Sequence, residues 1–412
     1  MAVDPSNDQC VDPVGYDPFS AEVLADPGAS YPALLESCPV HRYDGFDPPF
    51  YSLSRHDDVR DALRDVATYS SHYGQGPNMT VPGSMQSDPP QHTFFRRLVQ
   101  QAFTARAVNE MQPQIEALVD ELIDSFVDRG EADIHDELAY PLPTIVIAQM
   151  LGVPEHDREM FKEWSDASVA AMSSRTPEVF RPQREALNAY LIDHARHRLA
   201  LEAAGEPLPD DLVSRLVTAE QDGQRVGETD MVALLGQLLV GGNETTTSLI
   251  TNALVRLTED PARWERLHAD PEPALVDVAV EESLRFDPPV LGLFRTTTCP
   301  VRLHDEEIPE RAKVMLLYAA ANRDPRVFDD PNTFSLDRNL DELRRHHLSF
   351  GYGIHFCIGA ALARMEARIV LTKMAERFPG LRMTATPERI APFLLWGKKT
   401  LPMAWDVVGT AS

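Results

Sequence analysis

Apolar residues recur every three to four positions over most of the chain, which puts them on one face of a helix and predicts a mainly α-helical protein. Long segments of this kind predict helices at residues 108–129, 143–151, 155–172, 178–203, 230–257 and 360–377. Between residues 31 and 63 the pattern predicts a helix, two strands and a second helix, with GFDPP as the turn between the strands.

A smaller part of the chain has the pattern of strands. VLGLFRTTTC at 290–299 and KVMLLYAAAN at 313–322 are predicted strands, and 387–405 is rich in turns. Residues 1–30 contain Asp, Pro and Gly with little periodicity, so we expect an irregular N-terminal arm. Because nothing repeats and no linker divides the rest, we expect one domain at 31–412, mainly α with a smaller β-rich lobe (α+β).

Two segments interrupt the helical pattern in a way that suggests a binding site. Residues 68–90 form a long, irregular and partly apolar stretch that carries Met79 and Val81, and such a loop is typical of a lid or binding loop. The break SSRTP at 173–177 separates two predicted helices, and Val169 lies just before it. Core packing is the alternative for any single apolar residue here.

Charge and cysteine usage exclude several classes of protein. The formal charge of -26 over 412 residues offers no positive field for nucleic acid. The N-terminus lacks the basic start and apolar core of a signal peptide, and the longest apolar stretch falls short of the ~20 residues that span a bilayer. The four cysteines, Cys10, Cys38, Cys299 and Cys357, show no metal-ligand spacing. We expect a soluble cytoplasmic protein that binds neither nucleic acid nor membrane.

One cysteine lies in a loop built for a thiolate. FGYGIHFCIG at 350–359 places Cys357 between a glycine-rich turn and the first turn of the helix at 360–377, where unpaired N–H groups favour an anion. We expect positive φ or close ligand approach at Gly351, Gly353 and Gly359. A thiolate of lowered pKa held in this way is a ligand for haem iron. The alternative is a buried cysteine that acts as a small hydrophobe.

The middle of the helix predicted at 230–257 conflicts with its apolar flanks. VGGNETTTS combines two glycines with a cluster of polar side chains, which weakens a helix that should be buried. Hydroxyls of Ser and Thr can bond the carbonyl four residues back and open a local bulge with room for a small ligand. A polar stripe or a helix cap is the alternative.

Two charged pairs carry little information by themselves. His92 and Arg96 lie one turn apart on a predicted helix that follows Asp88, and this pattern alone favours a solvated surface. Glu282 and Arg285 form an i, i+3 pair of a kind that is common on helix surfaces.

Taken together and in this order, these motifs resemble the cytochrome P-450 superfamily, in its soluble bacterial, ferredoxin-dependent form, over roughly residues 30–405. The resemblance implies the cytochrome P-450 fold, a triangular prism of helices around a buried haem. It implies haem b (iron protoporphyrin IX) as the cofactor, with the Cys357 thiolate as the metal ligand. Glu244 in place of the commoner Asp stays within the pattern of the oxygen-binding segment.

The resemblance also implies roles for individual residues. The residues expected at the cofactor are His92, Arg96, Arg295, His355, Gly241 and Phe350. Thr245 and Glu244 are expected to be catalytic, holding dioxygen and relaying protons. The residues expected at the substrate are Met79, Val81, Val169, Leu238, Val290, Leu291 and Leu395. Glu282, Arg285 and Arg338 are expected to have a structural role on the thiolate side.

The function implied is a haem-thiolate monooxygenase. It would insert one oxygen atom of dioxygen, by hydroxylation or epoxidation, into a small hydrophobic substrate such as a terpenoid, steroid, fatty acid or aromatic compound. A peroxide-driven peroxygenase and a haem-thiolate sensor or carrier without turnover are alternatives, and the pair Glu244-Thr245 argues against both. A thiol hydrolase that uses Cys357 lacks any sign of a base and an orienting partner.

No flavin or iron–sulfur module is recognisable in the chain, so we expect electrons from a ferredoxin and a ferredoxin reductase that uses NAD(P)H, and a monomeric enzyme. The residues expected to form a positive docking patch are Arg344, Arg345, His346, His347, Arg364 and Arg368. An ordinary solvated cluster of charges is the alternative.

Overall fold

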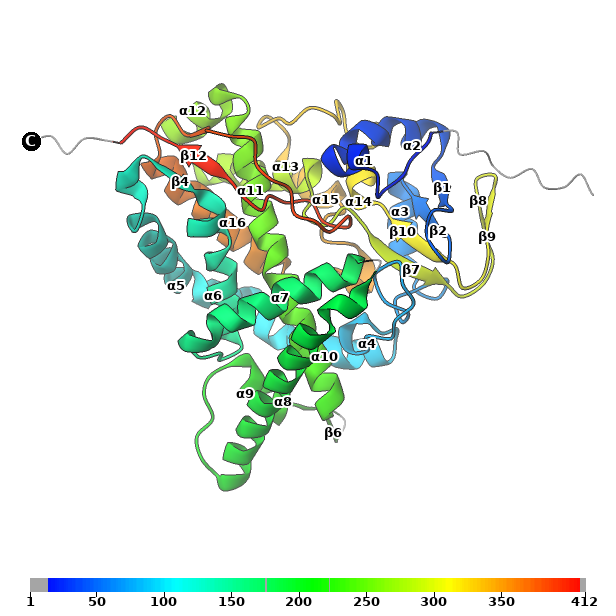
Figure 1. Ribbon diagram of the computed structural model, residues 1–412, viewed down its shortest axis with the longest axis vertical. Helices are drawn as coiled ribbons and strands as arrows, with labels where there is room; N and C mark the ends of the chain where they lie inside the picture. Colours follow the sequence, from blue (N-terminus) through cyan, green and yellow to red (C-terminus); the bar gives the residue numbers. More distant parts are fainter. Residues whose placement is uncertain (1–13, 175, 222, 408–412) are drawn as a thin grey trace, which may run out of the picture.

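The structure, a computed structural model, describes residues 14–174, 176–221 and 223–407. Most of these residues are helical, and the larger group of strands lies on the right of the view in Figure 1. The α-helices are α1 (Ala21–Ala25), α2 (Tyr31–Ser37), α3 (His56–Arg64), α4 (Gln91–Gln100), α5 (Ala105–Asp124), α6 (Pro141–Met150), α7 (Arg158–Ser173), α8 (Arg181–Ala204), α9 (Leu212–Thr218), α10 (Glu228–Gly242), α11 (Glu244–Thr258), α12 (Pro261–Ala269), α13 (Pro273–Phe286), α14 (Tyr318–Ala321), α15 (Leu340–His346) and α16 (Ala360–Arg377).

The strands form one larger sheet and three small ones. They are β1 (Val40–Tyr43), β2 (Phe50–Leu53), β3 (Tyr69–Ser70), β4 (Glu131–Asp133), β5 (Glu220–Gln221), β6 (Gln224–Arg225), β7 (Leu293–Thr297), β8 (Val301–Leu303), β9 (Glu306–Ile308), β10 (Lys313–Leu316), β11 (Arg382–Met383) and β12 (Pro402–Ala404). The five-stranded sheet has the order β1-β2-β10-β7-β3, and only β10 and β2 are parallel. The predicted fold class, mainly α with a smaller β-rich lobe, is confirmed.

The sequence pattern located most elements correctly. The hairpin of β1 and β2 pairs Val40 with Leu53, as GFDPP suggested, and α16 has the predicted limits. Three expectations were wrong. Residues 21–30, expected to be irregular, form α1 and the 3₁₀-helix η1 (Pro27–Ser30), because Ser20 and Asp26 cap them by accepting backbone N–H bonds. The division into an arm and one domain stays a prediction.

The other two corrections concern continuity. The helix predicted at 230–257 is two helices, α10 and α11, which meet at Asn243. The strand predicted at 313–322 ends with β10 at Leu316, and the next residues form α14 because YAAA is buried on all sides and carries good helix formers.

Helix α11 lies at the centre of the helical body. Nearly all of its residues are buried, among them Leu249, Ile250 and Leu254, and they share one core with apolar residues of α5, α13 and α16. A second core joins α6, α7, α8, α9 and α10, which form the lower part of the body in Figure 1. Because α10 belongs to one core and α11 to the other, the break between them lies where the two cores meet.

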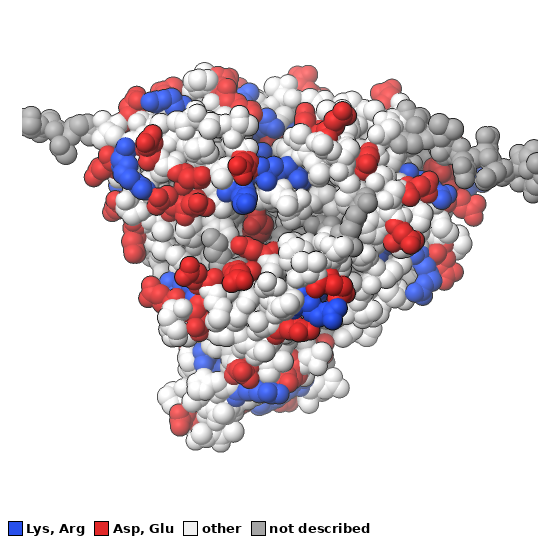
Figure 2. Space-filling model, in the orientation of Figure 1, with Lys and Arg blue, Asp and Glu red and all other residues white. Residues whose placement is uncertain are grey.

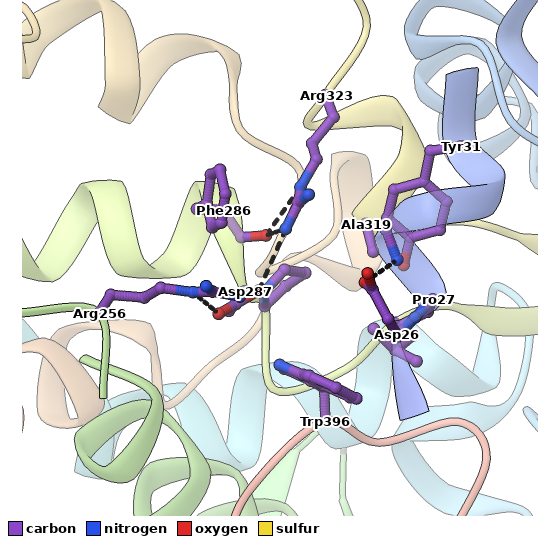
Figure 3. A pocket seen from close by; sticks show the side chains of 12 residues that line it. Asp26, Pro27, Tyr31, Arg256, Phe286, Asp287, Ala319, Arg323 and Trp396 are labelled. Atoms are coloured by element: carbon purple, nitrogen blue, oxygen red, sulfur yellow. Dashed lines mark hydrogen bonds and ion pairs between the residues drawn. The ribbon is translucent and has the colours of Figure 1, made fainter. Parts of the chain in front are cut away.

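A small pocket of about 10 Å³ lies where the N-terminal helices meet the body. Figure 3 shows Asp287 held between Arg256 (2.5 Å) and Arg323 (3.2 Å), while Arg323 also donates to the carbonyl of Phe286. The Tyr31 hydroxyl and the Trp396 indole N–H are buried here without a partner among the described residues. The space matches one water molecule, which would satisfy both donors.

The surface carries both signs of charge. On the face shown in Figure 2, carboxylates are spread over the whole surface and the Lys and Arg side chains stand among them. In the described part of the chain no helix is both long enough and apolar enough to cross a membrane.

Candidate functional site

A cavity of about 290 Å³ lies between the Cys357 loop and the helices α10 and α11, which together are called the distal helix. Its walls come from α4, α10, α11, the segment before β7, the loop at 349–359 and the start of α16. The volume is near the lower end for pockets that hold small organic ligands. Of the residues predicted to bind metal or cofactor or to be catalytic, all except Glu244 line it: Cys357, His92, Arg96, Arg295, His355, Gly241, Phe350 and Thr245.

The loop that carries Cys357 is closed by backbone bonds. The Cys357 N–H donates to the Phe350 carbonyl at 2.8 Å, and the Phe356 N–H donates to that of Gly353 at 3.1 Å. Gly351 and Gly353 have φ of 70° and 71°, as expected, because the turn needs the left-handed region that favours glycine. Gly359 has φ of -84° as the N-cap of α16, so it is not a position that needs positive φ.

The pKa of the Cys357 thiol is the reverse of what the sequence suggested. Burial among protein atoms raises the pKa, although the backbone N–H groups of Gly359 and Ala360 and the charges of Arg96 and Arg364 oppose the shift. The sulfur still faces open space, because the residue is exposed toward the cavity. A metal cation bound to this sulfur would favour the thiolate.

A second set of bonds fixes the loop to the protein core. Asn322 accepts the Leu348 N–H at 2.7 Å and donates to the Ser349 hydroxyl at 2.9 Å. Ser349 in turn donates to the Leu284 carbonyl of α13 at 2.6 Å. These bonds position the first residues of the loop against α13 before the chain reaches Cys357.

Four basic side chains gather at one end of the cavity. His92 and Arg96 come from α4, Arg295 from β7 and His355 from the cysteine loop. The centroids of the two imidazole rings lie 4.3 Å apart. Burial, together with the charges of Arg295, His92 and Arg96, lowers the pKa of His355 to about 3. Burial and Arg96 also lower the pKa of His92. Within residues 14–174, 176–221 and 223–407, neither arginine forms an ion pair with a carboxylate.

This arrangement fits a haem. The buried Nε2 of His355 has no partner among the described residues, and the adjacent arginines lack carboxylates, so the site is complementary to an anionic ligand group such as a propionate. A Cβ built on Gly241 would meet no atom within 4 Å, which leaves open space beside the distal helix. The described residues contain no cluster of three or more His, Cys, Asp or Glu that could hold a bare metal ion.

The distal helix is interrupted beside the cavity, in the segment VGGNETTTS that the sequence predicted to weaken it. Asn243 joins α10 to α11 with φ of -86° and ψ of -80°, which departs from helical geometry. The Thr245 hydroxyl donates to the Gly241 carbonyl four residues back at 2.6 Å, and Thr144 donates to the amide oxygen of Asn243 at 2.8 Å. Glu244 does not line the cavity, and Ser248 donates to its carboxylate at 3.4 Å.

Beneath the cysteine loop, Glu282, Arg285 and Arg338 form one buried network. Arg285 makes two bonds to Glu282, each of 2.7 Å, and Arg338 makes a third of 2.8 Å. Arg285 also donates to the Asn322 carbonyl at 3.1 Å, which links this network to the bonds that hold the loop. The ion pairs expected from the spacing are therefore present, and both side chains of the Glu282–Arg285 pair are fully buried.

The predicted docking patch is largely neutralised. Glu281, which is buried, pairs with Arg344, His347 and Arg364, and Asp277 pairs with Arg344 and Arg368. Burial by itself would raise the pKa of Glu281, but the bonds from His347 and Arg364 outweigh it and lower the pKa to about 2. The sequence could not show these partners, because Glu281 and Asp277 precede the patch by more than sixty residues.

The predicted substrate residues divide into two groups. Leu238 and Val290 line the cavity. Leu395 is not part of the lining and forms a β-bridge with Val290, while Leu291 packs in the core and lines the small pocket beside Asp287. Met79 and Val81 are exposed side chains outside the lining. The side chain of Val169 lies outside the described residues.

Sequence reasoning missed several residues that line the cavity. Gln237 precedes Gly241 by one helical turn, so the spacing that located Gly241 and Thr245 could also have found it. Gln75, Met85 and Gln86 come from the irregular loop at 68–90, whose internal path no pattern predicts. Glu366 lies on α16, where burial raises the pKa of its carboxyl group to about 8 and keeps it neutral at pH 7.

Comparison with known proteins gives consistent results. The model of the family described as Cytochrome P450 matches residues 47–399. Cytochrome P450 107B1 of Saccharopolyspora erythraea is 37% identical over 90% of this chain and 93% of its own length. Steroid C26-monooxygenase of Mycobacterium tuberculosis is 36% identical over 86% of this chain and 94% of its own length. The structure of Cytochrome P450 CYP109Q5 from Chondromyces apiculatus has a TM-score of 0.84 at 35% identity and covers 95% of this chain and 98% of that one.

Proposed function

The chain belongs to the cytochrome P450 family and is an oxidoreductase of the monooxygenase class, and from this premise we propose how its own residues serve that chemistry. The cofactor would be haem b, bound through the Cys357 sulfur. The observation that carries this proposal is the convergence of that sulfur, four basic side chains and the space beside Gly241 on one cavity. When bound, the haem supplies activation of dioxygen and insertion of one oxygen atom into the substrate.

The basic cluster would hold and orient the cofactor. Arg96 and Arg295 would donate to its carboxylates, which would give these guanidinium groups the anionic partners that they lack among the described residues, and His355 would lie against the same carboxylates. His92 lies against His355 and would take part in the same contacts. Phe350 would cover the thiolate side, where the Arg364 guanidinium stacks on its ring at 4.5 Å.

The interrupted helix would handle oxygen and protons. Thr245 lines the cavity, and its hydroxyl, which donates to the Gly241 carbonyl in this structure, would turn to donate a hydrogen bond to dioxygen. Glu244 is only partly buried and would carry protons inward from solvent. Apolar side chains such as Leu238, Leu249 and Val290 would exclude bulk water from the substrate side.

The substrate would be a small hydrophobic molecule that undergoes hydroxylation or epoxidation. Apart from the cofactor contacts, the lining is mostly aliphatic, with Ile147, Leu238 and Leu293 among its residues. The similar protein from Mycobacterium tuberculosis acts on a steroid by its name, which fits a pocket of this kind.

Electrons would come from a ferredoxin and its NAD(P)H-dependent reductase, and the enzyme would work as a cytoplasmic monomer. The docking surface supported best is the exposed part of the cysteine loop, where Tyr352, Ile354 and Phe356 are 37–41% exposed. Arg64 lies beside Gly353 of this loop, Arg345 lies in the last turn of α15 before it, and neither forms an ion pair within the part of the chain that the structure describes. An acidic ferredoxin would be complementary to these two charges.

Purified protein should carry one b-type haem, and its reduced carbon monoxide complex should have the red-shifted Soret band of thiolate ligation. Cys357→His should keep haem and lose that band. A variant that kept the band would move the ligand to Cys10, Cys38 or Cys299 and would contradict the proposal. Product formation from NAD(P)H and dioxygen, rather than from peroxide alone, would distinguish a monooxygenase from a peroxygenase.

The docking surface has its own test. Arg345→Glu combined with Arg64→Glu should slow reduction by ferredoxin and weaken its dependence on salt, while reduction by dithionite stays unchanged. Arg368→Glu serves as the control, because Asp277 already lies 3.9 Å from Arg368. A loss with both reductants would point to damage at the haem site.

A further inference from the structure

One polar side chain on the substrate side of the cavity has an unused hydrogen-bond acceptor. Gln237 on α10 lines the cavity, and its Nε2 donates to the Gly83 carbonyl at 3.1 Å. Because only the nitrogen end of the amide can donate to a carbonyl, this bond assigns the other end as the acceptor Oε1. The Oε1 atom is buried and has no partner among the described residues. An acceptor left in this state costs about 1–3 kcal/mol, so the site favours a ligand or a water that donates to it.

The position of Gln237 relates this acceptor to the place of reaction. Gln237, Gly241 and Thr245 follow one another at intervals of four residues and all line the cavity, so they share one face of the distal helix. With a rise of about 1.5 Å per residue, Gln237 lies roughly 6 Å from Gly241 along α10, and Thr245, which bonds the Gly241 carbonyl across the break at Asn243, lies up to roughly 12 Å from Gln237. A group bonded to Gln237 would therefore lie one to two helical turns from the oxygen site.

The surroundings of Gln237 exclude a charged anchor. Leu238, Ile147 and Met85 line the same part of the cavity, and the basic residues of the lining belong to the cluster of His92, Arg96, Arg295 and His355. A carboxylate placed at Gln237 would meet a carbonyl oxygen and, among the residues that the structure describes, no cation, in a desolvated position. A neutral hydroxyl or N–H would gain a hydrogen bond there.

We infer that Gln237 is a substrate-positioning residue, and that the substrate is an apolar molecule with a neutral hydrogen-bond donor roughly 6–12 Å from the carbon that is oxidised. The inference rests on the proposed function, because the reacting carbon is placed by the haem at Gly241 and Thr245. It selects apolar molecules that carry a neutral hydroxyl or amide N–H group. Free fatty acids are excluded, since their only polar group is a carboxylate.

Imidazole ligands with long tails can test this inference without a known substrate. The haem-loaded protein is titrated with ω-(imidazol-1-yl)alkan-1-ols of six to twelve carbons, with 1-alkylimidazoles of equal length and with the matching ω-imidazolyl carboxylic acids. The imidazole nitrogen binds the iron and shifts the Soret band, and this shift gives the dissociation constant. In wild type the alcohol should bind about fivefold to tenfold tighter than the alkyl compound at one chain length, and the acid should bind more weakly than either.

Two variants separate the acceptor from the loop contact. Gln237→Leu should abolish the preference for the alcohol, whereas Gln86→Leu, which removes another amide from the lining, should keep it. Loss of the Gln237 bond to the Gly83 carbonyl would lower the affinity for all three probes alike and would leave the ratio of their dissociation constants unchanged. This ratio therefore reports on the Oε1 acceptor of Gln237. Equal affinity of alcohol and alkyl probes in wild type, tighter binding of the acid, or an alcohol preference that survives in Gln237→Leu would overturn the inference. Absence of any Soret shift with imidazole itself would instead contradict the proposed haem site.

Discussion

The network beneath the cysteine loop and the helix pair α10 and α11 treat their buried polar groups in opposite ways. On the thiolate side, the carboxylates of Glu281 and Glu282 are almost fully buried, and each is bonded by several partners. On the distal side, the helix is broken at Asn243, and both the amide nitrogen of Asn243 and the amide oxygen of Gln237 lack partners among the described residues. A satisfied network gives a rigid frame, whereas unused polar groups leave room for ligands.

Removal of Glu282 should produce the largest effect, because it breaks the frame on the thiolate side. Glu282→Ala leaves the guanidinium of Arg285 buried without its carboxylate, which should lower the free energy of unfolding by about 3–5 kcal/mol. Urea titration followed by circular dichroism measures this change. Glu110→Ala, which removes an exposed ion pair with Arg106, is the control and should have no measurable effect. A small loss in Glu282→Ala would show that the network does not support the fold.

The pH dependence of stability should reveal the second carboxylate of the frame. Because the pKa of Glu281 is lowered to about 2 in the folded protein, its ionised form stabilises the fold above its unfolded pKa of about 4.5. That contribution, on the order of 3 kcal/mol, is lost as the pH falls from about 4.5 to about 2. The difference in unfolding free energy between wild type and Glu281→Gln should shrink over this range. A difference that stays constant with pH would refute the assignment.

On the distal side, a substitution should change the reaction and spare the fold. Thr245→Ala removes a hydroxyl that bonds only the Gly241 carbonyl, so haem content and stability should stay close to wild type. Product formed per NAD(P)H consumed should fall roughly fivefold, with the balance released as peroxide, because the lost hydrogen bond stabilises an intermediate and not the ground state. Thr245→Ser keeps the hydroxyl and should retain most of the coupling. Unchanged coupling in the alanine variant would move the role to Thr246 or to ordered water.

The smallest effect should come from the glycine beside the break. A Cβ at Gly241 meets no atom within 4 Å, so Gly241→Ala should raise the unfolding free energy of haem-free protein by about 0.5–1 kcal/mol through helix propensity alone. The same methyl group should weaken binding of imidazole to the haem-loaded protein, because it occupies the open space of the cavity. Gly236→Ala is the control, because a Cβ at Gly236 on the same helix also meets no atom within 4 Å and Gly236 does not line the cavity, so imidazole affinity should stay unchanged. Equal affinity in both variants would show that this space is not used by ligands.

The sequence predicted the central residues of the candidate site better than it predicted the other residues that line the cavity. Cys357, Gly241 and Thr245 lie in short motifs whose spacing already carries the chemistry, and the cavity brings all three together. Leu291 and Leu395 were expected at the substrate and lie outside the lining, because Leu291 packs in the core and Leu395 pairs with Val290 in an isolated bridge, and the sequence specifies neither contact. Gln75 and Gln86 escaped notice because their loop has no periodicity.

The sequence by itself determined the fold class, most helices, the cysteine loop and the weak point of the distal helix, since each depends on contacts between residues close along the chain. Only the tertiary structure decided which charged side chains form ion pairs. Arg344, Arg364 and Arg368 resemble an open positive patch in the sequence, yet Glu281 and Asp277 neutralise them from a distant helix. It also decided the pKa of Cys357, which burial raises where the helix N-terminus alone would lower it. Electrostatic properties depend on every group within reach in space and on desolvation, and neither follows from local order along the chain.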